Sequence, residues 1–210
     1  MFITFEGLDF SGKSTQATIL VEKLKKSNRV VHFLREPGGT KISERIREIL
    51  LDKKNLEMGD AAELLLFSAA RAQLVKEIVV PALQRGESVV CDRYYDSTTA
   101  YQGYGRGIDL DAVKSINRLA TGGRDPDITF LVDIPVAEIE RRKQRAGVMF
   151  DRMESSGRTF YERVRSGYRE IASSESYRFV VLDGMSGVEE IARNIWALVE
   201  KRQTVIRTQA

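Results

Sequence analysis

The residues best suited to chemistry lie near the N-terminus, in a glycine-containing run of eight. The run fits the pattern G-x-x-x-x-G-K-[ST] and reads Gly7-Leu8-Asp9-Phe10-Ser11-Gly12-Lys13-Ser14. In this pattern glycines let backbone N–H groups curl around phosphate oxygens, and the amino end of the following helix adds partial positive charge. We expect Lys13 to reach the β- and γ-phosphates of a nucleotide and the Ser14 hydroxyl to ligate Mg²⁺. A plain glycine turn could match by chance, but the apolar strand before the run and the helical pattern after it favour phosphate binding.

Phosphate binding leaves the reaction open, since GTPases, motors, ATPases and small-molecule kinases all use such a loop. A GTPase would carry a guanine-reading Asn-Lys-x-Asp sequence after a later strand, and the chain has none. Motors and ring ATPases generally need larger domains than 210 residues provide. A kinase of small molecules fits both observations.

Two charged motifs follow later apolar runs, at the points where those runs end. The first is Arg35-Glu36-Pro37-Gly38-Gly39-Thr40, and the second is Asp92-Arg93-Tyr94. The carboxyl ends of parallel strands are where α/β sheets bind ligands. Asp92 can hold Mg²⁺, usually through water, and Arg93 can bind a phosphate through its guanidinium fork. A simple Pro-Gly turn and a structural Asp92–Arg93 ion pair are the alternatives.

These motifs, taken in order, resemble thymidylate kinases of the bacterial type. The resemblance runs from residue 2 to about residue 183, and its specificity lies in the joint order of the blocks. They are Phe5-Glu6-Gly7-Leu8-Asp9, Arg35 to Thr40, Phe67-Ser68-Ala69-Ala70-Arg71, Asp92-Arg93-Tyr94, Ser97 and Ala100-Tyr101-Gln102-Gly103. The resemblance implies transfer of the ATP γ-phosphate to thymidine monophosphate, with Mg²⁺ as cofactor, giving thymidine diphosphate and ADP. It also implies a homodimer and a sheet with strand order 2-3-1-4-5.

The resemblance assigns a role to each acceptor-side residue. Phe67 stacks on thymine and Arg71 bonds a base carbonyl; Arg47 and Arg93 clamp the acceptor phosphate. Asp9 contacts the sugar 3′-hydroxyl and, with Tyr101, selects deoxyribose, while Ser97 and Gln102 read the edge of the base. The substrate-binding set is Asp9, Glu36, Pro37, Arg47, Phe67, Arg71, Arg93, Ser97, Tyr101 and Gln102. Spacing alone would favour a core Phe67 with a solvated Arg71, and Arg47, on a polar helix face, could be only surface charge.

A basic segment at about residues 141–157 resembles the lid of these kinases. It contains Arg141-Arg142-Lys143-Gln144-Arg145-Ala146-Gly147 and Asp151-Arg152-Met153-Glu154. Arg145 and Arg152 are the candidates for the residue that places positive charge at the migrating phosphate. With Lys13, Asp9 and Arg93 they make up the expected catalytic set. One of Arg141 and Arg142 would pack on adenine. A solvated helix face is the alternative for each of these arginines.

The ATP-binding set is Gly7, Leu8, Asp9, Phe10, Ser11, Gly12, Lys13, Ser14, Thr15, Arg141 and Arg142, and the metal set is Ser14 and Asp92. Phe10 departs from the family, where relatives commonly carry Gly or a catalytic Arg. Phe supplies neither charge nor a small side chain, which strengthens the lid-arginine interpretation and puts the shape of the loop in question.

Short apolar runs alternate along the chain with longer helical patterns, and the strands and helices that they predict must position these residues. Strands are expected at residues 2–5, 30–34, 88–91, 128–132 and 179–182. Helices are expected at 14–25, 42–51, 61–83, 110–120, 136–145, 160–172 and 188–202, with Pro81 interrupting the third near its end. Near-continuous apolar strands alternating with helices predict an α/β, P-loop NTPase fold with a five-stranded parallel sheet covered on both faces.

Composition limits the number of domains, the kinds of partner and the cellular compartment that are expected. The 210 residues, with 42% hydrophobic and 30% charged side chains, predict one P-loop kinase domain over 1–210 with the lid inserted. A net charge of +3 does not require nucleic acid as a partner. Cys91 is the only cysteine, which favours the reducing cytoplasm. No run approaches the ~20 apolar residues of a membrane span. The stretch Ala61 to Leu83 could form the dimer interface or the core.

Two rival functions remain at this stage. Another nucleoside-monophosphate or deoxynucleoside kinase could share the fold; the latter would need a carboxylate base beside a free 5′-hydroxyl, for which Glu36 is a candidate. A nucleotide-dependent switch or scaffold could bind ATP without transferring phosphate. Lys13, Asp92 and the lid argue against the switch, and Phe10 favours it.

Overall fold

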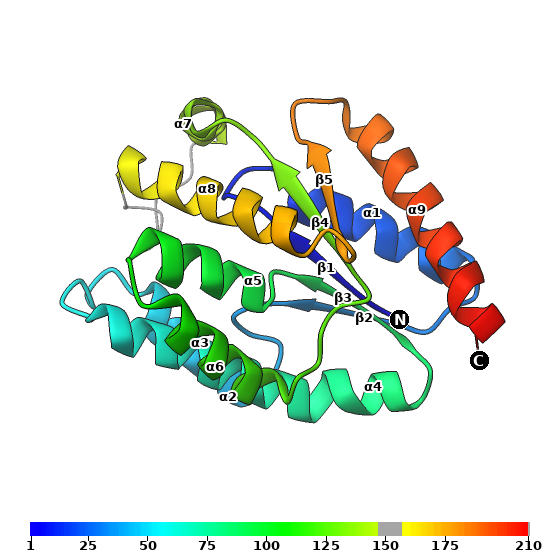
Figure 1. Cartoon of the computed structure of the whole chain (residues 1–210), viewed down its shortest axis with the longest axis horizontal. Coiled ribbons are helices and arrows are strands. Elements are labelled where there is room, and N and C mark those ends of the chain that lie inside the picture. The colour runs from blue at the N-terminus through cyan, green and yellow to red at the C-terminus, as the bar shows by residue number, and fades with distance from the viewer. Residues whose placement is uncertain (147–156, 210) are drawn as a thin grey trace.

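A computed structural model describes residues 1–146 and 157–209 of the chain. Five parallel strands form one sheet in the order β2-β3-β1-β4-β5, which confirms the order that the resemblance implied (Figure 1). Their bounds are β1 Phe2–Glu6, β2 Val31–Arg35, β3 Ser88–Asp92, β4 Ile128–Asp133 and β5 Phe179–Asp183. Each expected strand lies within one or two residues of an observed one.

The burial of each strand explains its composition. Every residue of β1 and β3 is buried, because these strands lie inside the sheet and helices cover both of their faces. Such strands are mostly apolar rather than alternating. Polar residues in them, such as Thr4 and Glu6, have buried hydrogen-bond partners. The edge strands β2 and β5 expose part of their side chains instead.

Alternate side chains of the strands enter cores on opposite faces of the sheet. Ile3 and Phe5 pack in the core formed with α1 (Lys13–Lys26) and α9 (Val188–Gln209). Phe2 and Val89 point the other way, into a core with the helical stretch that precedes β3. Figure 1 shows α1 and α9 on one side of the sheet and the remaining layer on the other. The sheet covered on both faces is therefore confirmed.

That second layer contains the helices on the acceptor side. They are α2 Lys41–Leu51, α3 Asp60–Leu74, η1 Val75–Val79, α4 Val80–Gln84, α6 Leu110–Thr121 and α8 Arg158–Ser174, and α7 Val136–Ala146 follows β4. The single helix expected over 61–83 contains a π-helical turn, η1, just before Pro81. Proline has no N–H to donate to the carbonyl four residues earlier, and a wider turn accommodates it without ending the helix.

The helical segment directly after β3 was not expected from the sequence. It comprises α5 (Tyr95–Thr98) and the π-helical η2 (Thr99–Gly105), whose threonines and glycines have low helix propensity. Packing against α8 fixes it: a Cβ on Gly105 would lie 2.6 Å from the Phe160 ring. The segment is central to the site because it carries Ser97, Tyr101 and Gln102.

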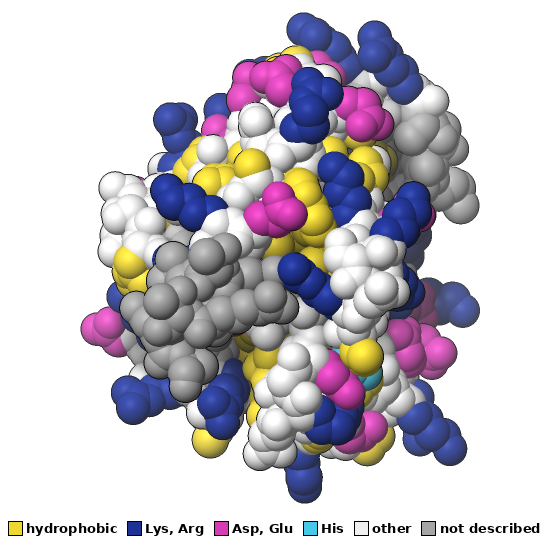
Figure 2. Space-filling model, turned by 90° about the vertical axis from the view of Figure 1, so that its right-hand side faces the viewer, with side chains coloured by type: hydrophobic (Ala, Val, Ile, Leu, Met, Phe, Trp, Pro, Cys, Tyr) yellow, Lys and Arg dark blue, Asp and Glu magenta, His cyan; other side chains and the backbone are white. Residues whose placement is uncertain are grey.

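The last helix is also longer than expected. The pattern predicts an end at residue 202, but α9 continues to Gln209. None of the helices in the described ranges, 1–146 and 157–209, is long and apolar enough to cross a membrane. On the side of the molecule where both termini lie, Lys and Arg side chains are scattered among Asp and Glu rather than gathered in one track (Figure 2).

A buried ion pair joins the start of the edge strand β5 to helix α5. Arg178, just before β5, donates from Nη1 and Nη2 to the two carboxylate oxygens of Asp96 on α5, both at 2.8 Å. Its Nη1 also lies 2.8 Å from Thr129 Oγ1 on β4. Both charged side chains are 1% exposed. A pair this deep is favourable only while both partners are present.

We therefore predict that Arg178→Met lowers the free energy of unfolding by roughly 3–5 kcal/mol, because Asp96 is left charged and unpaired in the interior. Urea titration at fixed protein concentration measures this. The double variant Arg178→Met/Asp96→Leu should recover part of the loss. Arg158→Met, which breaks an exposed pair with Glu162 on α8, is the control and should change stability by less than about 1 kcal/mol. Equal effects of the two single variants would contradict the interpretation.

Candidate active site

The phosphate-binding loop lies between β1 and α1. Its glycines are required where they stand: Gly7 has φ 137°, and a Cβ there would lie 2.5 Å from the Val132 carbonyl oxygen. Gly12 has φ 95° and caps α1. Only glycine adopts these angles readily. The loop therefore curls directly onto the amino end of a 14-residue helix, the arrangement that binds phosphate through backbone N–H groups.

Lys13, the first residue of α1, is buried in the loop. Its Nζ lies 3.5 Å from the Leu8 carbonyl oxygen, so the ammonium group is held across the loop. Burial, and then the nearby charge of Arg93, lower the pKa of Lys13 from its usual value. A cation that the protein solvates this poorly gains strongly from a polyanionic ligand.

Ser14 and Asp92 meet beside the loop. The Ser14 hydroxyl donates a short hydrogen bond to a carboxylate oxygen of Asp92, at the carboxyl end of β3. Hydroxyl and carboxylate oxygens are ligands that Mg²⁺ accepts. In the described part of the chain no group of three or more His, Cys, Asp or Glu could hold a metal alone. The two residues thus fit a Mg²⁺ ion that also takes phosphate oxygens and water as ligands.

Phe10 occupies the loop in the left-handed conformation, with φ 60°. For a bulky side chain this conformation is strained. Its ring is partly buried against the cluster that includes Leu8 and Ile139, and Lys143 Nζ lies 5.8 Å from the ring centroid. The departure from the family therefore leaves the loop in its curled form, at a cost in backbone strain and with a gain in packing.

The basic helix α7 touches the loop through one arginine. Arg142 donates from Nη1 to the carbonyl oxygens of Phe10 (3.0 Å) and Ser11 (3.2 Å), and from Nη2 to that of Gly184 (2.9 Å). Its side chain is 28% exposed, whereas Arg141 is 70% exposed and pairs with Glu138. Arg145 is exposed on α7, and it does not line the cavity beside the loop that is described next. Arg152 lies outside the described residues, as does most of the expected lid.

A cavity of 230 Å³ opens beside the loop. Its lining unites residues from the phosphate loop, from the carboxyl ends of β2 and β3, and from α1, α2, α3, α5 and η2. Thirteen of the expected residues lie there: Asp9, Lys13, Ser14, Glu36, Pro37, Arg47, Phe67, Arg71, Asp92, Arg93, Ser97, Tyr101 and Gln102. Arg35, Leu51 and Thr98 complete it. The strand-end motifs and the phosphate loop thus form a single site.

Arg93 connects the two parts of this site. It follows β3 with φ 72°, a conformation uncommon for a non-glycine residue. Its Nη1 donates to the Gly7 carbonyl oxygen at 3.1 Å and to Ser97 Oγ at 3.0 Å. Its Nη2 lies 2.6 Å from Asp9 Oδ1. One guanidinium therefore bonds the phosphate loop to the acceptor segment, the helical stretch α5–η2 that carries Ser97, Tyr101 and Gln102.

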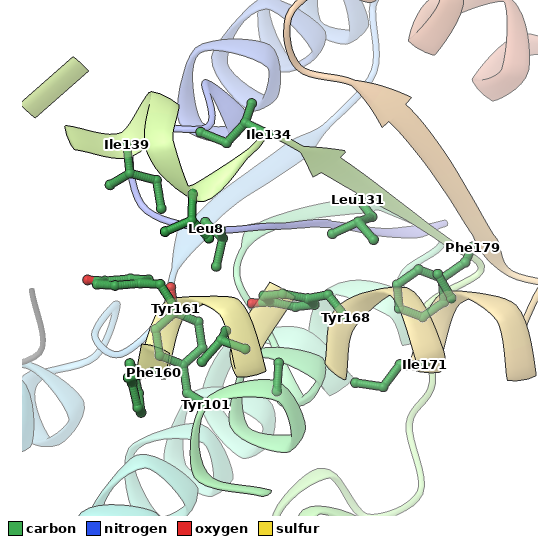
Figure 3. Packing of buried hydrophobic residues seen from close by; sticks show 14 residues of the cluster. Leu8, Tyr101, Leu131, Ile134, Ile139, Phe160, Tyr161, Tyr168, Ile171 and Phe179 are labelled. Carbon is green, nitrogen blue, oxygen red and sulfur yellow. The ribbon is translucent and has the colours of Figure 1, made fainter. Parts of the chain in front are cut away.

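Asp9 faces this guanidinium from the loop. Its Oδ2 accepts hydrogen bonds from Tyr101 and Tyr161, each at 3.2 Å. Burial acts to raise the pKa of Asp9, but the charges of Arg93 and Lys13 outweigh it, and the net shift is downward. Figure 3 shows Tyr161 on α8 packed beside Phe160, with Tyr168 further along the same helix. Asp9 is thus a fixed carboxylate in an aromatic wall.

At the far end of the cavity, Arg71 is fully buried and held by protein acceptors. Its Nε donates to Glu36 Oε2 at 2.7 Å, Nη1 to Thr98 and Asn117, and Nη2 to the Tyr94 carbonyl oxygen. Burial raises the pKa of Glu36 to about 7, although Arg71 opposes the shift. The alternative of a solvated Arg71 is therefore excluded, and Phe67 lines the cavity one helical turn earlier.

The remaining expected residues, Ser97, Gln102 and Arg47, are hydrogen-bonded to other protein groups. Ser97 donates to Glu6 Oε2 at 2.6 Å, so its hydroxyl bridges Glu6 and Arg93, and its role at the base stays a prediction. Burial and then Asp96 raise the pKa of Glu6 to about 7. Gln102 donates to the buried Glu63 at 2.9 Å. Arg47 donates to the Pro37 carbonyl oxygen at 2.9 Å.

A signal for Glu6 was available in the sequence. It is a charged residue at the end of an otherwise apolar strand, next to the loop, where a buried carboxylate needs partners. Tyr168, which bonds both Glu6 and Arg93, and Glu63 had no comparable local signal. Their partners become neighbours only through the fold.

A phosphate loop, an Asp–Ser pair suited to Mg²⁺ and an adjoining cavity lined by arginines on a five-stranded parallel sheet define a P-loop nucleotide kinase. Comparison with known proteins identifies the family within this class of kinases. A family model described as thymidylate kinase matches residues 5–195. The chain belongs to the thymidylate kinase family.

Individual relatives agree. Thymidylate kinase of Chlorobaculum parvum is 47% identical over 208 residues, covering 95% of each chain. That of Roseiflexus sp. strain RS-1 is 47% identical over 211 residues, covering 95% of this chain and 93% of its own. The crystal structure of thymidylate kinase from Ehrlichia chaffeensis has a TM-score of 0.77 at 35% identity and covers 95% of this chain and 98% of that one.

The strain at Phe10 yields a stability prediction. Phe10→Gly and Phe10→Ala lose the same ring contacts, but only alanine keeps the left-handed penalty. We predict that the glycine variant is more stable than the alanine variant by about 1 kcal/mol, the reverse of their usual order. Urea unfolding of both variants measures the difference. An alanine variant of equal or greater stability would show that residue 10 is not held at positive φ.

Proposed function

We propose that the chain transfers the γ-phosphate of ATP to thymidine monophosphate. The observation that carries the proposal is the single cavity that starts at the phosphate loop and ends at Arg71 and Gln102. Its loop end suits the donor phosphates, and its far end suits a base, so a nucleotide can place its own phosphate between them. Membership of the thymidylate kinase family supports the choice of acceptor.

The far end supports a pyrimidine with a 4-oxo group. Arg71 has five N–H donors, and four protein acceptors take one each. One Nη2–H is left without an acceptor among the residues described, and it can donate to a base carbonyl. Phe67, on the same face of α3, can stack on the ring.

The sugar lies between the two ends in this proposal. Asp9 accepts from Tyr101, and the Tyr101 ring lies beneath the Arg93 guanidinium at 5.1 Å. This closed wall leaves Asp9 as an acceptor for the 3′-hydroxyl, and Tyr101 fills the space where a 2′-hydroxyl would project. Deoxyribose is favoured for steric reasons.

The reacting groups meet at the loop. Arg93 and Arg47 clamp the acceptor phosphate, and Lys13 bonds the β- and γ-phosphates of ATP. Ser14 and Asp92 would hold Mg²⁺ together with the nucleotide, and the ion would supply positive charge to the phosphate oxygens. The acceptor phosphate is itself the nucleophile, so no general base is needed; the residues position the two phosphates in line and hold positive charge around them. The lowered pKa of Asp9 keeps it ionised, which fixes Arg93 rather than supplying a proton.

The lid roles complete the proposal. Arg142 contacts two loop carbonyl groups and is therefore the better candidate to lie beside adenine than the solvated Arg141. Because Phe10 carries no charge, the positive charge that stabilises the migrating phosphate comes from the lid, through Arg145 or Arg152.

The quaternary and cellular settings are also proposed. Exposed alanines and Leu65 share one face of α3, and Leu65 is an apolar side chain that a second copy of the chain could cover. We propose that one kinase domain spans residues 1–210 and dimerises through this face. The bacterial relatives and Cys91, a single buried cysteine that forms no disulfide, support a cytoplasmic site of action.

An acceptor panel tests the function directly. With ATP and Mg²⁺, coupled ADP release should be strong with thymidine monophosphate, weak with other nucleoside monophosphates and absent with thymidine. The control Lys13→Met should lower kcat at least about 100-fold and exclude a contaminating kinase. Preference for another acceptor would overturn the base assignment, turnover of thymidine would indicate a nucleoside kinase, and ATP binding without transfer would indicate a switch.

A further inference from the structure

One buried amide in the acceptor cavity has its orientation fixed from behind. Gln102 on η2 is buried, and its Nε2 lies 2.9 Å from Oε1 of Glu63 on α3. An ionised carboxylate accepts hydrogen bonds and cannot donate them. The NH₂ group of Gln102 must therefore face Glu63, and its carbonyl oxygen must face away from it.

Arg106, just after η2, keeps Glu63 in the form that enforces this orientation. Its Nε and Nη2 donate to the two oxygens of Glu63, both at 3.2 Å. Its guanidinium also lies 4.7 Å from the centroid of the Phe160 ring, which holds it in place. A guanidinium fork favours the ionised carboxylate. A neutral carboxyl group would not fix the orientation of the Gln102 amide, because it can donate a hydrogen bond to the amide oxygen or accept one from the amide NH₂ group.

Gln102 lines the acceptor cavity, and in the described part of the chain its side chain makes only the hydrogen bond to Glu63. The amide oxygen is thus the part of Gln102 left for a ligand. Arg71 offers one N–H at the same end. Arg71 and Gln102 therefore present one donor and one acceptor, side by side, to the edge of a base.

That pair matches one class of pyrimidine. Thymine and uracil carry an accepting 4-oxo group beside a donating N3–H. Cytosine has the reverse pattern, a donating 4-amino group beside an accepting N3. Against cytosine, the cavity would set donor against donor and acceptor against acceptor.

We propose that Glu63, a residue that need not touch the substrate, sets the selectivity of the enzyme for 4-oxo pyrimidine nucleotides by fixing the Gln102 amide. This inference rests on the proposed function and adds the determinant of its base selectivity. Glu63 acts as a positioning residue through Gln102, and Arg106 supports it from behind.

Glu63→Gln tests the inference, because the new amide both donates and accepts and lets Gln102 adopt either orientation. We expect kcat/KM for thymidine and deoxyuridine monophosphates to fall about tenfold, mainly through KM. The ratio of kcat/KM for deoxycytidine monophosphate to that for thymidine monophosphate should rise at least about tenfold. Loss of fold integrity alone would lower all three acceptors together and leave the ratio unchanged.

Asp60→Asn is the matched control. Asp60 also contacts Arg106, at 3.4 Å, but it is 54% exposed whereas Glu63 is 1% exposed, and no contact joins Asp60 to Gln102 among the residues described. This variant should keep the parental selectivity. If Glu63→Gln fails to fold, Arg106→Met loosens the same carboxylate while retaining an apolar chain against Phe160, and should shift the ratio in the same direction.

The outcomes separate the two proposals. A parent that prefers thymidine monophosphate, with unchanged selectivity in Glu63→Gln or, where that variant does not fold, in Arg106→Met, overturns the role of Glu63 and leaves the function standing. A parent with no preference over deoxycytidine monophosphate overturns both. A selective parent with relaxed selectivity in Glu63→Gln or Arg106→Met alone, and not in Asp60→Asn, supports both.

Discussion

The site depends on one guanidinium. Arg93 follows the interior strand β3 in a left-handed conformation and bonds the loop at Gly7 and Asp9 and helix α5 at Ser97. Phosphoryl transfer between two nucleotides is chiefly a problem of distance and alignment. Because the same side chain is hydrogen-bonded to both halves, the position of the acceptor is set by the position of the donor loop.

Other buried charges around Arg93 keep this arrangement rigid. Glu6 accepts from Ser97 and Tyr168, both of which also accept from Arg93. Arg71 is fixed on Glu36 in the same way at the base end. Each group would be costly in the interior without its partner. The polar network therefore links the specificity of the pocket to the stability of the fold.

The sequence predicts most of this, for a physical reason. The loop, the strand ends and the amphipathic helices depend on neighbours in the chain, so Lys13, Asp92 and Arg93 were identified and meet in one site. The segment Thr99–Gly105 was missed because only its packing on α8 makes it helical. The Gln102–Glu63 and Ser97–Glu6 contacts join residues 39 and 91 positions apart, which no local pattern reports. The individual roles at the substrate remain predictions.

The kcat of Arg93→Lys at saturating ATP and thymidine monophosphate tests most directly whether Arg93 aligns the acceptor with the donor loop. Lysine keeps the positive charge but loses the fork that bonds the loop and the acceptor segment at once. We predict that kcat falls about 100-fold, that the affinity for ATP stays close to the parental value, and that the melting temperature falls by only a few degrees, because the charge is kept while some hydrogen bonds are lost. A kcat within about threefold of the parent would contradict it, because charge alone would then suffice and the joint bonding of the two halves would not govern the reaction.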